Sequence, residues 1–183
     1  MKNPLPEDPV RRGRAKLALL ALFFLLPVGA SWLIWWLDLV PAAPGNYGTL
    51  LQPHPVVLPA AGDLKGRWVL VQFDGGACDS RCERKLYVMR QVRRAQGREM
   101  QRMARLWLLT DAAQPRAELL AAIEGTVLAP AGAARGFPAD PSVADCIYLV
   151  DPLGNLMMRF PREPDPSRMI KDLQRLLRAS SFG

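Results

Sequence analysis

Hydrophobic residues are distributed unevenly along this chain of 183 residues, with one long apolar run near its start. Residues 17–37 form a stretch of 21 amino acids without a formal charge. At a helical rise of ~1.5 Å per residue, this run spans ~31 Å, which matches the hydrocarbon core of a bilayer. Trp32, Trp35 and Trp36 lie at its far end, where membrane-interface tryptophans are expected. The pattern predicts one transmembrane helix over residues 17–37.

A cleaved signal peptide is the competing interpretation of the same run. The run is longer than a typical signal core, and the proline after Ala42-Ala43 makes a poor cleavage site, so we favour a retained anchor. The charges before the run are mostly basic (Arg11, Arg12, Arg14, Lys16), whereas Asp38 is the first charge after it. The positive-inside rule then makes residues 1–16 a cytoplasmic basic tail. We expect an anchor in a bacterial inner membrane and a periplasmic domain.

The segment after the anchor has a different composition. Residues 38–62 are rich in proline, glycine and alanine, which disfavours a helix and predicts an extended linker between membrane and domain. His54, the only histidine of the chain, lies between two prolines in this segment. Because one imidazole defines no site, we interpret it as a solvated loop residue.

From residue 63 onward, short apolar runs alternate with amphipathic ones. Four apolar runs read as strands: residues 67–73, 103–110, 146–150 and 156–160. Three helical patterns read as helices: residues 80–96 after a cap at Asp79 or Ser80, residues 115–123, and a terminal helix capped by Asp165-Pro166. The order βαβα…ββα predicts an α/β thioredoxin-like sandwich over residues 63–183.

The net charge of the predicted domain limits the classes of partner that we expect for it. The net charge is +7, but part of it belongs to the basic tail, so the predicted domain is only mildly basic. We therefore expect no nucleic-acid partner. Arg84, Lys85 and Arg90 are among the basic residues of the second predicted element, and we expect them on a solvated face.

Two cysteines follow the first predicted strand of this domain. Cys78 and Cys82 come after the Gly75-Gly76 break, at the expected start of a helix. A thiolate is stabilised there by free backbone N–H groups and the helix dipole, and the thiolate binds soft metals and attacks disulfides. A static disulfide or two buried apolar side chains is the alternative. With Cys146 the chain has three cysteines, which allow one disulfide and one remaining thiol in an oxidising compartment.

The same segment resembles the Sco/SenC family, whose members are membrane-anchored thioredoxin-fold proteins that help deliver copper to cytochrome c oxidase. Phe73 and the C-x-x-x-C pair Cys78 and Cys82 carry the likeness, although Asp79 and Glu83 stand where the family usually has proline. A second matching patch is residues 147–152 with Gly154, and the likeness extends loosely over residues 47–178.

The resemblance implies copper bound by Cys78, Cys82 and a histidine near Val143, but residues 141–146 contain no histidine. Cys146 lies near that position in sequence and is a further candidate ligand. We therefore consider three hypotheses: a Cu(I) metallochaperone for cytochrome c oxidase assembly, a thiol–disulfide oxidoreductase acting through Cys78 and Cys82, and an inactive scaffold. The first describes an assembly factor rather than a turnover enzyme. The expected partners are the membrane and an oxidase subunit or another assembly factor.

Overall fold

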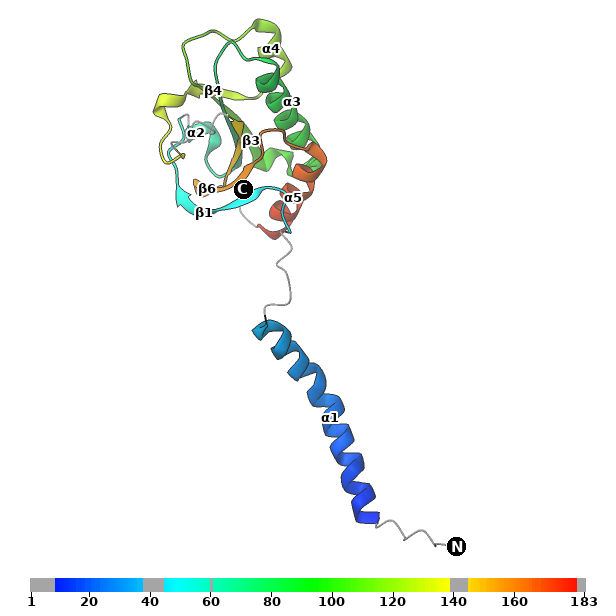
Figure 1. Ribbon diagram of the computed structural model, residues 1–183. Coiled ribbons are helices and arrows are strands. Elements are labelled where there is room, and N and C mark those ends of the chain that lie inside the picture. The colour runs from blue at the N-terminus through cyan, green and yellow to red at the C-terminus, as the bar shows by residue number, and fades with distance from the viewer. Residues whose placement is uncertain (1–8, 38–44, 60, 139–144, 181–183) are drawn as a thin grey trace. The chain divides into compact units, whose positions relative to one another are not determined.

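The computed structural model describes residues 9–37, 45–59, 61–138 and 145–180, and it is shown in Figure 1. The chain divides into two compact units, Met1–Gly45 and Asn46–Gly183. Among its described residues, the first unit contains one helix, α1 (Pro9–Trp36), and the span Lys16–Trp36 of this helix has a mean hydropathy of 2.4. By length and composition this helix is able to cross a membrane. The predicted apolar helix is confirmed, and it begins within the predicted basic tail.

The second unit is built on a six-stranded sheet with the order β1-β6-β5-β2-β3-β4. Its strands are β1 (Thr49–Pro55), β2 (Trp68–Asp74), β3 (Met103–Leu109), β4 (Val127–Pro130), β5 (Ile147–Val150) and β6 (Asn155–Phe160). Strands β2, β3 and β4 are parallel to one another, whereas β5 pairs antiparallel with both β2 and β6. The remaining elements are α2 (Ala61–Leu64), α3 (Ser80–Arg94), α4 (Ala117–Ala122) and α5 (Pro166–Ala179), with short 3-10 turns at Gly97–Arg102 and Ala131–Ala133.

Helices α3 and α5 pack on one face of the sheet. Their apolar residues share a buried cluster with side chains from β2, β3, β5 and β6. Along β2, Leu70 belongs to this cluster, whereas Val69 and Val71 belong to a second cluster on the other face. Strands β2 and β3 therefore need apolar residues on both faces, which explains their uninterrupted apolar runs. The predicted α/β thioredoxin-like fold is confirmed.

The predicted linker 38–62 differs from the structure from Asn46 onward. Residues 49–55 form the edge strand β1, which pairs antiparallel with β6. Proline is compatible with this position, because an edge strand has unpaired N–H groups on its outer side. The buried carboxylate of Asp172 on α5 also accepts hydrogen bonds from the backbone N–H groups of Tyr47 (2.7 Å) and Gly48 (2.8 Å). The folded unit thus begins well before residue 63.

Candidate functional site

The loop from β2 to α3 carries both cysteines, and its shape requires glycine. A side chain at Gly76 would collide with the carbonyl oxygen of Ala113, and a Cβ at Gly75 would lie 2.5 Å from Asp111 Oδ2. Asp111 Oδ1 accepts hydrogen bonds from the N–H groups of Gly76 (2.8 Å) and Ala113 (3.1 Å). The loop after β3 therefore fixes the cysteine loop, and Asp111 is the residue that joins them.

Cys78 and Cys82 are joined by a disulfide, with their Cα atoms 5.2 Å apart. Cys82 is fully buried and Cys78 is 5% exposed, but Ala77 and Asp79 on either side of Cys78 are exposed. Cys78 also has a positive φ of 46°, which is uncommon for a residue other than glycine. A disulfide with both cysteines buried corresponds to the alternative considered from the sequence, and Cys78 is the less deeply buried of the two.

Asp79 caps the N-terminus of α3. Its carboxylate accepts hydrogen bonds from the backbone N–H groups of Arg81 (3.0 Å) and Cys82 (2.9 Å). The hydrogen bond from Cys82 lowers the pKa of the Asp79 carboxyl, and the Arg81 guanidinium acts in the same direction. These two N–H groups are thus occupied by a carboxylate. From the sequence we expected such N–H groups to stabilise a cysteine thiolate. A thiolate at Cys82 therefore needs a different hydrogen-bond donor.

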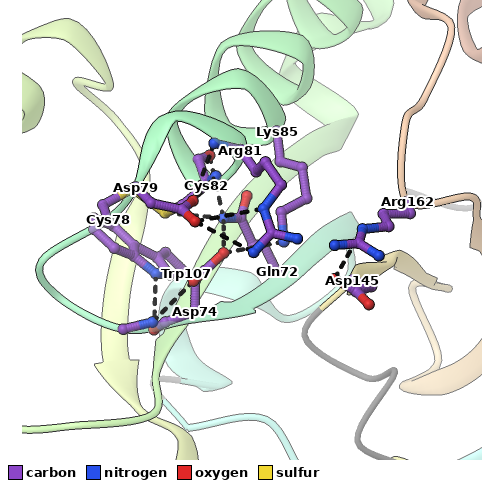
Figure 2. A network of polar contacts seen from close by, with 11 residues as sticks. Gln72, Asp74, Cys78, Asp79, Arg81, Cys82, Lys85, Trp107, Asp145 and Arg162 are labelled. Atoms are coloured by element: carbon purple, nitrogen blue, oxygen red, sulfur yellow. Dashed lines mark hydrogen bonds and ion pairs between the residues drawn. A yellow bond between two sulfur atoms is a disulfide. The ribbon is translucent and has the colours of Figure 1, made fainter.

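That donor is a buried amide beneath the disulfide, shown in Figure 2. Gln72 on β2 is fully buried, and its Nε2 lies 3.3 Å from Cys82 Sγ. The same nitrogen lies 3.3 Å from the backbone oxygen of Cys82 and 3.3 Å from Asp74 Oδ2. Asp74 Oδ2 in turn pairs with Lys85 Nζ at 3.0 Å. A polar network thus connects the end of β2 to the first turn of α3 at the sulfur.

The position of Lys85 differs from the one expected from the sequence. It was expected on a solvated basic face, but its side chain is only 5% exposed and pairs with Asp74. It lies one residue before the buried Leu86 on α3, so the apolar stripe of this helix is flanked by the lysine. Gln72 was also missed, although it is the one polar residue between Trp68 and Phe73 in the predicted first strand. A polar residue inside an apolar strand is the signal that marks it.

A small polar hollow opens beside this network. It measures about 80 Å³ and is lined by six charged residues: Asp74, Asp79, Arg81, Lys85, Asp145 and Arg162. Arg162 and Asp145 form an ion pair of 3.4 Å along its rim, as Figure 2 shows. The surroundings of the disulfide are therefore charged on the side of the hollow. On the other side, Cys78 and Cys82 pack in a cluster that includes Trp107 and Leu119.

The other candidate ligands lie elsewhere. Cys146 packs against the buried cluster that contains Phe73 and Tyr148. Phe73 follows Gln72 along β2, so the side chains of these two residues lie on opposite faces of the sheet. Because Gln72 contacts Cys82, Cys146 lies on the other face of the sheet from Cys82. The ring of His54 is within 2.9 Å of the Gln52 carbonyl oxygen and 2.8 Å of that of Gly136. Within residues 9–37, 45–59, 61–138 and 145–180, no group of three or more His, Cys, Asp or Glu side chains is arranged to hold a metal ion. The position near Val143 lies outside the described residues.

A parallel β2–β3 pair, an antiparallel β5–β6 pair and a cysteine pair at the start of α3 define a thioredoxin-like protein. The family model for the "transmembrane-like, thioredoxin-like, C-terminal domain" matches residues 68–180. The chain therefore belongs to this family. No curated protein matches the sequence.

The solved structures that resemble the chain include Sco proteins. ScoI of Arabidopsis thaliana with copper bound is 12% identical, with a TM-score of 0.50 over 73% of this chain and 99% of that chain. ScoI of Bradyrhizobium japonicum with copper bound is 19% identical, with a TM-score of 0.49 over 70% and 98%. Apo Sco1 of Thermus thermophilus is 16% identical, with a TM-score of 0.49 over 76% and 99%. The predicted resemblance to Sco proteins is confirmed, and at these identities it is a likeness of fold.

Proposed function

We propose that this chain is a membrane-anchored assembly factor of cytochrome c oxidase that acts on the periplasmic side of a bacterial inner membrane through Cys78 and Cys82. The observation that carries this proposal is the position of both sulfurs, within bonding distance at the start of α3. The apolar span Lys16–Trp36 supports the anchor, and the basic residues before it support the orientation. The likeness to a Sco structure with copper bound supports copper as the cargo, and the resemblance of the cysteine segment to the Sco/SenC family supports the oxidase as its destination.

In its first form, the proposed activity is the handling of Cu(I) as cargo. Reduction of the disulfide gives two thiols, and two thiolates suit a soft ion such as Cu(I) without help from imidazole. The donor set fits this ion in chemical type, because both donors are sulfur, and the disulfide shows that the two sulfurs lie next to each other. Cys146 does not belong to this set, because it packs in the cluster on the opposite face of the sheet.

A second candidate function is thiol–disulfide exchange with a partner, and the disulfide itself favours it. In the reduced protein, the Cys78 thiolate attacks a partner's disulfide, forms a mixed disulfide and expels one partner thiolate. The Cys82 thiolate then attacks Cys78 Sγ, closes the internal disulfide and releases the second partner thiolate. The partner gains two electrons and this chain loses two. Reducing the cysteines of a copper-receiving subunit would unite the two functions.

Two measurements on the full chain in nonionic detergent separate these functions. Titration of the reduced protein with Cu(I) against a competing chelator should give binding that is lost in Cys78→Ala/Cys82→Ala and kept in the matched control Cys146→Ala. Binding that survives the double substitution would rule out the copper proposal. For exchange, a reduction potential well below about −300 mV would identify a structural disulfide, which physiological thiols do not reopen, so that no dithiol form would be available for exchange. A chain that fails both tests is a scaffold.

The proposed orientation has its own test. Tyr87 on α3 is 57% exposed, so a Tyr87→Cys substitution in a chain without its three native cysteines offers one accessible thiol. A membrane-impermeant maleimide should label this thiol in cells whose outer membrane has been permeabilised. Labelling only after the inner membrane is disrupted would place the domain in the cytoplasm and refute the proposal.

A further inference from the structure

The amide of Gln72 lies where the leaving sulfur of the disulfide would carry its charge. Cys82 is fully buried in an apolar cluster with Leu86 and Trp107, so a charged sulfur there is strongly disfavoured unless a donor meets it. Gln72 Nε2, 3.3 Å from Cys82 Sγ, is in place to donate. The backbone N–H of Cys82 is already bound to Asp79. The side chain of Gln72 therefore supplies what the helix terminus does not.

The Asp74–Lys85 pair determines which end of the amide faces the sulfur. A carboxamide nitrogen only donates and its oxygen only accepts, so the nitrogen must be the end that meets the carboxylate of Asp74. Asp74 is itself held by Lys85 Nζ at 3.0 Å and by the Gly75 N–H at 3.1 Å. In this orientation the oxygen of Gln72 is buried without a hydrogen-bond partner among the described residues. The nitrogen side is thus kept at the sulfur, although the oxygen is left unsatisfied.

We propose that Gln72 is a positioning residue for thiol–disulfide exchange at Cys78–Cys82, held in its donating orientation by Asp74 and Lys85. A partner thiolate attacks the Sγ of Cys78, the less deeply buried of the two cysteines, and forms a new S–S bond with it. The Cys78–Cys82 bond breaks, and its electron pair goes to Cys82 Sγ, which leaves as a thiolate toward the Gln72 N–H. No proton moves in this step. In the reverse step the Cys82 thiolate attacks Cys78 Sγ and expels the partner thiolate.

This inference rests on the proposed function, because it concerns the same sulfur pair and requires that the disulfide can be opened. It adds a residue that neither the C-x-x-x-C spacing nor the likeness to Sco proteins indicates. Gln72 lies on β2, ten residues before Cys82, and it reaches the sulfur only because α3 packs over that strand. The same contact would also assist attack by Cys82 during resolution, since the amide keeps the buried sulfur directed toward the loop.

The test is the second-order rate constant for reduction of the oxidised full chain by dithiothreitol, in nonionic detergent at one fixed pH. Gln72→Leu removes the donor and should slow the reaction about tenfold, the usual effect of one hydrogen bond to a charged group. Gln72→Glu keeps the shape but presents a carboxylate to the leaving sulfur, so it should react more slowly than Gln72→Leu. Lys85→Met frees Asp74 and should also slow the reaction.

Gln96→Leu is the matched control. Gln96 is also buried and its amide also donates within the fold, to the Val92 carbonyl oxygen at 3.0 Å, but it lies beyond the other end of α3. This variant should lose stability in urea unfolding without a change in exchange rate. Folded Gln72→Leu and Gln72→Glu variants that react as fast as the unmodified chain would overturn the inference. If the unmodified chain itself resists dithiothreitol, the proposed function fails first and independently.

Discussion

Opening the Cys78–Cys82 disulfide should leave the domain folded. The two cysteines are only four residues apart, so the disulfide closes a very short loop. In the loop-entropy model, a cross-link of this length contributes about 2 kcal/mol, against about 5 kcal/mol for a loop of a hundred residues. A domain of this size has an unfolding free energy of about 5–15 kcal/mol. The dithiol form should therefore retain most of its stability, as either proposed function requires.

The assay is urea unfolding of the full chain in nonionic detergent, followed by near-UV circular dichroism with and without excess reductant. The buried Trp107, which belongs to the same cluster as both cysteines, makes this signal sensitive to the site. We expect the midpoint to fall by an amount that corresponds to about 2 kcal/mol, and Cys78→Ala/Cys82→Ala should match the reduced protein. A reduced chain that has lost its cooperative transition would refute the reasoning. It would mean that the disulfide holds the α3 N-terminus in place.

Three further predictions concern the loop and the edges of the sheet. Gly76→Ala should destabilise the domain by about 1–3 kcal/mol in urea unfolding, because its Cβ would collide with the Ala113 carbonyl oxygen; unchanged stability would show that this loop can move. Asp172→Ala should cost about 2–4 kcal/mol, since two backbone N–H groups lose their acceptor, and a loss below 1 kcal/mol would contradict this. The backbone carbonyls beside His54 raise its pKa, so the stability it adds is present below the unfolded value of 6.5 and is lost as the pH rises through the higher folded value. His54→Ala should remove this pH dependence of the melting temperature, and a variant that keeps it would assign it to another group.

Much of the fold is predictable because its central strands are uninterrupted apolar runs. Residues 67–73 and 103–110 were predicted as strands, and the structure has β2 at Trp68–Asp74 and β3 at Met103–Leu109. The caps of α3 and α5 are similarly local, since Asp79 and Asp165 accept hydrogen bonds from the first turns that they precede. Such features depend only on neighbouring residues and are therefore visible in the sequence.

The missed elements depend on contacts that are distant in sequence. Strand β1 contains two prolines and is a strand only because β6 lies beside it, and β4 is a run of four residues in an Ala/Gly/Pro-rich segment. At the site, the cysteine pair was predictable from its position after a strand. The contact of Gln72 with Cys82, and the burial of Lys85, depend on how α3 lies over β2, which no local pattern specifies.

The position of β1 has a practical consequence for expression of the domain alone. Without residues 46–62, β6 would become the outermost strand and present a row of unsatisfied backbone groups, which promotes association between copies. The Asp172 carboxylate would also lose its two backbone donors. A fragment cut at the apparent end of the proline-rich segment should therefore precipitate or form oligomers, whereas one that starts at Asn46 should remain monomeric.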